Sequence, residues 1–158
     1  MGQLKIRVEL SELRKQRDQQ KGLARIWTEA EGFEFPEKRW DDFIFITLSG
    51  WSSVIVNMLN NNYDMCILRY VDGNYAMKFE KSSGSNYSVS FGKWDMFDEI
   101  FESENSFTMQ LNIDDFVLEL IKINDEVVNV IKSEEISSEY IQDFIDWSNK
   151  LKDNKQGF

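Results

Sequence analysis

The 158-residue sequence has no histidine, one cysteine and one proline. Without histidine, Ser-His-Asp and Cys-His arrangements are excluded, and proton transfer would fall to carboxylates, lysine or tyrosine. The single thiol, Cys66, excludes an internal disulfide and a cysteine-based zinc site, as a reducing compartment permits. Because Cys66 lies in an apolar stretch that suits a strand, we interpret it as a core residue and not as a nucleophile. The sequence therefore predicts no enzyme activity, no metal site and no cofactor.

Long apolar runs are also missing. No stretch reaches the roughly 18 apolar residues of a membrane span, and the N-terminal MGQLKIRVEL is amphipathic where a signal peptide would be continuously apolar. We therefore expect a cytoplasmic protein without membrane contact. Hydrophobic residues make up 42% of the chain and aromatic residues 14%, which excludes a disordered protein. The length predicts a single domain over residues 1–158, with a frayed tail at residues 153–158.

Negative charge is concentrated in the second half of the chain. Residues 1–92 hold 12 acidic and 12 basic side chains, whereas residues 93–158 hold 16 acidic and 6 basic, which accounts for the net charge of -10. One interpretation is a solvated face that keeps the protein soluble. The other is a docking surface for a basic protein, because opposed potentials steer encounter. The candidate partner-binding residues of this second interpretation are Trp94, Asp95, Phe97, Asp98, Glu99, Glu102, Glu104, Asp114, Asp115 and Glu119.

A nucleic-acid partner is not expected from these patterns. Stacking platforms for bases need aromatic side chains interleaved with lysine and arginine, whereas Trp94 and Phe97 are interleaved with acids, which repel a phosphate backbone. The cluster of basic residues is interpreted as a solvated connection, and its members are Arg14, Lys15, Arg17 and Lys21.

Hydrophobic periodicity in the first half predicts two strands and a helix. Apolar residues alternate with charged ones over residues 4–10, and alternation resumes over residues 24–30, so two strands joined by a long hairpin or a short helix are expected. Pro36 and Glu37 indicate a helix start, and helical spacing of apolar residues then predicts one long helix that ends near residues 60–62. The alternative is a buried strand over residues 43–48, with Ser49 capping a shorter helix.

The second half predicts a strand meander followed by two helices. Strands at residues 65–71 and 75–81 flank an Asp-Gly-Asn turn, a second turn leads to a strand at residues 87–91, and residues 107–111 suit one further strand. Asn112 or Asp114 is expected to cap the next helix, and Ser137 the last one. The resulting fold class is α+β: an antiparallel sheet of about five or six strands, packed by one long central helix and two C-terminal helices.

Two pairs of neighbouring carboxylates could be considered for metal binding or glycoside hydrolysis. They are Asp41-Asp42 and Asp114-Asp115. Both pairs fall at expected helix starts, where carboxylates bind exposed N–H groups, so we interpret them as structural. A histidine-free hydrolase that uses paired carboxylates is accordingly the least favoured function.

The segment Phe35–Phe43, FPEKRWDDF, resembles the FPE-x-x-W-x-D-F stretch of small bacterial immunity proteins of polymorphic toxin and contact-dependent inhibition systems. The motif covers nine residues, and looser agreement extends over residues 24–150. Arg39 and Gly50 depart from the pattern, which leads us to expect Gly and an aromatic residue at those places. Trp40 and Phe43 are expected to stabilise the fold, and no toxin-contacting residue is carried over, because such contacts differ between pairs.

The resemblance implies a protein that binds and blocks one cognate toxin, often a basic nuclease, and needs no catalytic residue for this. We therefore hypothesise an immunity protein that occludes the active site of a cognate basic toxin domain. The alternative is an acidic adaptor or regulatory protein that binds several partners weakly.

Overall fold

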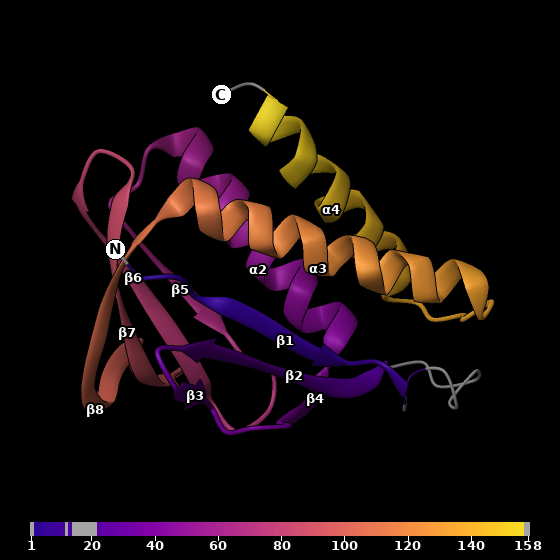
Figure 1. Cartoon of the computed structure of the whole chain (residues 1–158), viewed down its shortest axis with the longest axis horizontal. Helices are drawn as coiled ribbons and strands as arrows, with labels where there is room; N and C mark the ends of the chain where they lie inside the picture. Colours follow the sequence, from indigo (N-terminus) through magenta and orange to yellow (C-terminus); the bar gives the residue numbers. More distant parts are fainter. Residues whose placement is uncertain (1, 12, 14–21, 157–158) are drawn as a thin grey trace.

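The computed structural model describes residues 2–11, 13 and 22–156, and in this part of the chain eight strands form two four-stranded antiparallel sheets. Helices α2, α3 and α4 lie over one side of the sheets, with α3 and α4 in orange and yellow (Figure 1). The elements are β1 (Lys5–Glu9), β2 (Leu23–Ala30), β3 (Phe33–Phe35), β4 (Asp41–Phe43), α2 (Ile44–Asn61), β5 (Met65–Arg69), β6 (Tyr75–Ser83), β7 (Asn86–Asp95), β8 (Ile100–Asn112), α3 (Ile113–Ser133) and α4 (Ile141–Gln156). The α+β class is confirmed, whereas the single sheet of five or six strands is wrong.

The first sheet is built around β2. Strand β1 pairs with β2 in antiparallel register, and the short strands β3 and β4 also pair with it. Ile6 and Ile26 are buried, as the alternation predicts. The connection between the two predicted strands and the basic cluster of Arg14, Lys15, Arg17 and Lys21 lie outside the described residues.

The predicted helix start at Pro36 is wrong. Strand β3 ends at Phe35, Arg39 adopts a left-handed φ of 62°, and β4 then pairs with β2. Helix α2 begins only at Ile44, since the backbone of β4 finds its hydrogen-bonding partners in β2, far away in the sequence. A pattern of apolar residues cannot reveal such a partner.

Helix α2 itself is long, as the periodicity predicts. Its residues from Ile44 to Leu48 are helical, so the alternative strand over residues 43–48 is wrong, and Ser49 does not begin a helix. The helix ends at Asn61, where Asn62 has the left-handed φ of 52° that is common after a helix. The end predicted near residues 60–62 is confirmed.

The second sheet is the predicted meander, in the order β5-β6-β7-β8. The turn before β6 places Gly73 and Asn74 at positive φ values of 73° and 59°, which the Asp-Gly-Asn sequence tolerates. Strand β8 is much longer than the predicted segment 107–111, because its acid-rich first half also pairs with β7. The sheet therefore ends in a projecting β7–β8 hairpin.

The helices pack on the two sheets, and together they enclose one continuous hydrophobic core. Asn112 caps α3 by accepting the N–H of Asp114 at 2.8 Å. Of the two residues that were expected to cap this helix, Asn112 is therefore confirmed and Asp114 is not. Before α4, the hydroxyl of Ser138 accepts the N–H of Tyr140 at 3.3 Å, so Ser138 stands where Ser137 was predicted, and α4 continues to Gln156. The helices in the described part of the chain lack the combination of length and apolar character that a membrane span needs.

Candidate functional site

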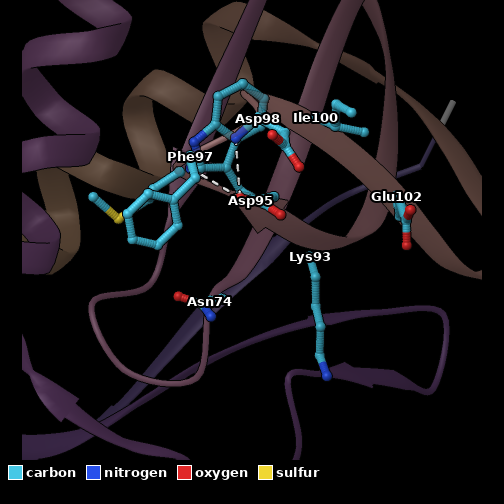
Figure 2. Close-up of a pocket in the computed structure, with 9 residues that line it drawn as sticks. Asn74, Lys93, Asp95, Phe97, Asp98, Ile100 and Glu102 are labelled. Carbon is cyan, nitrogen blue, oxygen red and sulfur yellow. Dashed lines mark hydrogen bonds between the residues drawn. The ribbon is translucent and has the colours of Figure 1, made fainter.

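The end of the β7–β8 hairpin carries most of the predicted partner-binding residues, and we call residues 94–104 the acidic tip. Residues 96–99 form the turn, and one carboxylate oxygen of Asp95 accepts the N–H of Phe97 at 2.8 Å and that of Asp98 at 3.1 Å (Figure 2). An aspartate that binds the backbone two residues on is a turn-forming arrangement. Asp95 therefore shapes the tip in addition to contributing its charge.

Apolar side chains project from the acidic tip into solvent. Phe97 is 98% exposed, Met96 58% and Ile100 51%. Single exposed apolar residues are common on soluble proteins, but these three lie within five positions of one hairpin. Together they form an apolar centre, in which the Sδ of Met96 accepts an N–H of the Arg69 guanidinium at 2.9 Å.

A hollow of about 410 Å³ lies beside this apolar centre. Trp94 lines it from β7, Ile100 and Glu102 line it from β8, and Asn74 lines it from the neighbouring turn. The carbonyl of Asn74 accepts the N–H of Trp94 at 2.9 Å, so the turn before β6 supports the tip. Trp94 is half-buried, and its ring forms part of the wall.

The electrostatics of the acidic tip are dominated by carboxylates. Asp95, Asp98, Glu99 and Glu102 are all exposed. Lys93 also lines the hollow, but its ammonium group binds Glu104 at 3.2 Å, lies 5.3 Å from the centre of the Tyr75 ring, and points away from Asp95 and Asp98 (Figure 2). A cationic partner would therefore meet several carboxylates before it met this lysine.

The structure brings seven of the ten predicted residues to the acidic tip and leaves three elsewhere. Asp114, Asp115 and Glu119 belong to α3, which begins after the far end of β8. A strand of this length extends for roughly 40 Å at about 3.3 Å per residue, so these three do not share a surface with the tip. The seven at the tip are Trp94, Asp95, Phe97, Asp98, Glu99, Glu102 and Glu104.

The three predicted residues on α3 each have a structural role. Asp114 and Asp115 lie in the first turn, where negative charge stabilises a helix. Glu119 accepts the backbone N–H of Ile6 at 3.0 Å and so binds α3 to the edge of β1. The sequence analysis missed Met96 and Ile100, although a Met-Phe pair among acids already resembles an apolar anchor within a polar rim.

The carboxylate pair Asp41-Asp42 does not form an acid–base site. Both residues belong to β4 and not to a helix start, which corrects their predicted place. Asp41 is exposed and lies 3.6 Å from Arg25, whereas Asp42 is fully buried, so the two carboxylates do not share one environment. Among the described residues, no three side chains of Asp, Glu or Cys gather as they would to hold a metal ion.

The carboxylate of the buried Asp42 accepts hydrogen bonds from backbone N–H groups. It accepts the N–H groups of Phe43 at 2.7 Å, Val71 at 3.1 Å and Asp72 at 3.2 Å. Burial raises the pKa of Asp42, and the hydrogen bonds from these N–H groups partly offset this by lowering it. Cys66 is buried, which confirms it as a core residue, and burial raises the pKa of its thiol to about 12.

The acidic tip is thus a hairpin end, hydrogen-bonded to the turn before β6, that joins an exposed apolar centre to exposed carboxylates. Such a combination suits binding to a cationic surface, because apolar anchors contribute affinity and charges steer the encounter. Comparison of the chain with known protein families, curated proteins and solved structures found no match.

Proposed function

We propose that this chain is an immunity-type binding protein, which neutralises a cognate basic toxin domain by covering its active site. The observation that carries the proposal is the acidic tip, where Phe97 is 98% exposed beside Met96 and Ile100 and among exposed carboxylates. Exposed aromatic side chains within polar rims are the usual anchors of protein interfaces. The carboxylates would raise the association rate with a basic surface.

The mechanism would be steric and electrostatic. The tip projects from the sheet, so its turn can enter a concave surface such as a substrate groove while the carboxylates meet basic residues around it. No covalent step is needed, because a groove that is filled by Phe97 and its neighbours no longer admits substrate.

The FPEKRWDDF segment supports the immunity assignment within this proposal. Arg39 has the left-handed φ of 62°, at the place where the resemblance leads us to expect Gly. Glycine is the residue that adopts this conformation most readily. Trp40 packs edge-on against Tyr75, with ring centres 5.1 Å apart, as a residue that stabilises the fold would.

Co-expression tests the proposal directly. The chain is produced together with the toxin encoded beside its gene, and growth of the host is measured with and without it. Rescue of growth is the expected result, and failure to rescue would count heavily against an immunity function.

Affinity capture supplies the biochemical test. The tagged protein is exposed to lysate of its source cell and washed at low and then at high salt. One stoichiometric, basic partner is expected to remain, because apolar anchors persist when charges are screened. Many weak partners that are lost together at high salt would favour the acidic adaptor instead.

A further inference from the structure

A second hollow, separate from that of the acidic tip, lies between α2 and β5, which are neighbouring elements (Figure 1). It is a groove of about 430 Å³, a size within the roughly 300–1,000 Å³ of small-molecule sites. Its apolar lining comprises Ile46, Trp51, Val54, Ile67, Val71 and Met96. Sites for small molecules are mostly apolar, with few polar groups that fix the orientation of the ligand. The lining of this groove has that character.

Two buried aromatic side chains form the inner part of the groove. Trp51 and Tyr70 both line it, and each is 1% exposed. Their rings meet edge to face, with centres 5.2 Å apart. The indole N–H of Trp51 donates to the carbonyl of Arg69 at 2.8 Å, and the hydroxyl of Tyr70 donates to the carbonyl of Phe35 at 3.1 Å. Because these polar groups are bonded within the fold, the two side chains offer a ligand apolar ring surface.

Among the described residues, one charged side chain lines the groove, and it is that of Arg69. The hydroxyl of Ser53, which also lines it, donates to the carbonyl of Gly50 at 3.0 Å. Asp95 precedes Met96 in sequence, but it lines the hollow of the acidic tip and not this groove. A ligand in the groove would therefore meet one guanidinium group and no carboxylate of the lining.

The side chain of Arg69 lies at the exposed end of this apolar surface. Side chains alternate between the two faces of a strand, so Arg69 and Ile67 share one face of β5, while Cys66 and Leu68 are buried on the other. An N–H of the guanidinium donates to the Sδ of Met96 at 2.9 Å, and Met96 is 58% exposed. A thioether sulfur is only a weak acceptor. A ligand that offers a stronger acceptor could therefore bind the same guanidinium.

Arg69 differs from the other arginines that the structure describes. The other three bind carboxylates: Arg7 pairs with Glu29, and Arg25 and Arg39 pair with Glu9. No carboxylate in the described part of the chain forms such an ion pair with Arg69. Carboxylates are not scarce, since the chain has 28 acidic and 18 basic side chains. A guanidinium presents a planar fork of N–H donors that matches a carboxylate, and this fork is left for a carboxylate from outside the fold.

We propose that the groove binds a small molecule in which an apolar chain ends in a carboxylate, as in a medium-chain fatty acid. The carboxylate would accept two N–H groups of Arg69 in the bidentate arrangement that suits a guanidinium, and the apolar chain would lie along Trp51 and Ile67. The net charge of -10 repels anions at long range. Binding therefore requires both the contact with Arg69 and burial of the apolar chain.

This inference goes beyond the proposed function and does not depend on it. The groove shares only Met96 with the hollow of the acidic tip among the residues that line the two. Failure of the chain to rescue growth from a toxin would leave ligand binding in the groove unaffected. Failure to bind the ligand would leave the toxin proposal standing.

The test uses octanoate as the probe, titrated into the isotope-labelled full chain and followed by NMR chemical shifts. We expect saturable binding with a dissociation constant of about 5 mM or below. Shifts should move at the indole N–H of Trp51, the amide of Ile67 and the methyl group of Met96, which line the groove. The methyl group of Met65, which does not line it, should keep its shift.

Two further probes separate the contribution of the charge from that of the apolar chain. Octylammonium has the same apolar chain and the opposite charge, and a protein of net charge -10 would bind it more tightly than octanoate if only long-range electrostatics acted. We expect it to bind the groove about tenfold more weakly or not at all, because it meets the like charge of Arg69. Hexanoate lacks two methylene groups, and their burial predicts roughly tenfold weaker binding.

Substitutions of Arg69 test the charge within the protein. Arg69→Gln removes the charge, and we expect it to weaken octanoate binding about tenfold or more. Arg69→Lys keeps the charge but not the fork, so a smaller loss of about threefold is expected. Lys38→Gln is the matched control, because it removes an equal charge at an exposed position outside the groove, and it should change the affinity less than about twofold. The backbone carbonyl that binds Trp51 is retained in both variants of Arg69.

Several outcomes would overturn the inference. They are octanoate binding that does not saturate, shifts that lie away from the groove, equal or tighter binding of octylammonium there, and unchanged affinity of Arg69→Gln. An octapeptide of alternating valine and glutamate that binds the same residues about tenfold more tightly than octanoate would assign the groove to an acidic peptide instead. A dimer of the chain that octanoate dissociates would assign it to a second copy.

Discussion

The carboxylate of Asp42 accepts the backbone N–H of Val71 at 3.1 Å, across 29 positions of sequence. Asp42 is fully buried, and this bond ties β4 to the loop that precedes β6. The same loop carries Asn74, whose carbonyl accepts the N–H of Trp94. One buried side chain is therefore linked, through two hydrogen-bonded steps, to the acidic tip.

Replacing Asp42 by Asn should destabilise the protein. One of the two oxygens becomes an NH₂ group that cannot accept the N–H of Val71 or of Asp72, and an unsatisfied buried donor costs about 1–3 kcal/mol. Urea unfolding at neutral pH measures the change. Asp41→Asn is the matched control: that side chain is 64% exposed, so a change of only about 0–1 kcal/mol is expected.

The stability difference between the wild type and Asp42→Asn should depend on pH with a defined sign. Because burial raises the pKa of Asp42 above its ordinary value of 3.8, the folded chain binds this proton more readily than the unfolded chain. The stabilisation that comes from this raised pKa is then complete below pH 3.8 and is lost as the pH rises through the folded-state pKa, whereas the hydrogen bonds from Val71 and Asp72 remain at neutral pH. The free energy of unfolding of the wild type, minus that of Asp42→Asn, should decrease over this interval. An increase would show that the N–H donors outweigh burial.

Gly92→Ala should destabilise the β7–β8 hairpin. A Cβ at this position would overlap the backbone carbonyl of Glu102 on the neighbouring strand, and its closest contacts are backbone atoms that cannot rotate away. Overpacking of this kind typically costs about 1–3 kcal/mol. Thermal unfolding measures the loss. An unchanged melting temperature would mean that the strands separate here without cost.

Charge reversal at the acidic tip should slow association with the captured partner. Asp98→Lys/Glu102→Lys is expected to lower the association rate constant about tenfold or more at low salt, because the carboxylates steer a basic surface. Glu126→Lys/Asp153→Lys alters the net charge equally at exposed positions outside the tip and is the control. Asp95 is left unchanged, since it holds the turn. Stopped-flow measurements across salt concentrations would show equal slowing by both variants if only net charge mattered.

Phe97→Ala should weaken partner binding without affecting folding. The side chain is 98% exposed, so the stability change should stay within about 0.5 kcal/mol. An anchor residue costs roughly 2 kcal/mol or more of binding energy when it is truncated, and calorimetric titration measures this loss. Tyr63→Ala, which removes another exposed aromatic, should leave the affinity unchanged. Equal affinity of Phe97→Ala and wild type would remove Phe97 from the interface.

The predictions from sequence succeeded where the physical cause is local. The alternation around Ile6 and Ile26 reports the two faces of a strand, and the side chain of Asn112 binds a backbone group only two positions away. The turn at Gly73 depends on conformational freedom that the residue itself possesses. Most of the acidic tip was also predictable, because the residues of a hairpin end are neighbours in sequence.

The failures share a different cause. Pro36 and Glu37 favour a helix, but the backbone of β4 pairs with β2, so α2 begins only at Ile44. The carboxylates of α3 were grouped with the tip by composition, and the length of β8 separates them. The hollow between α2 and β5 has no sequence signal at all, since its walls come from a helix and a strand whose side chains meet only in the folded chain.

The sequence by itself determined the α+β class, the meander, the limits of the two C-terminal helices to within a few residues, and the concentration of negative charge. These depend on periodicity, turn sterics and composition, which act over a few residues. Only the tertiary structure decided that there are two sheets, that Asp42 is buried while Asp41 is exposed, and that Met96 of the hairpin end contacts Arg69 of β5. Those features depend on which distant backbone and side-chain groups become partners, and the energy of such contacts exists only once the chain has folded.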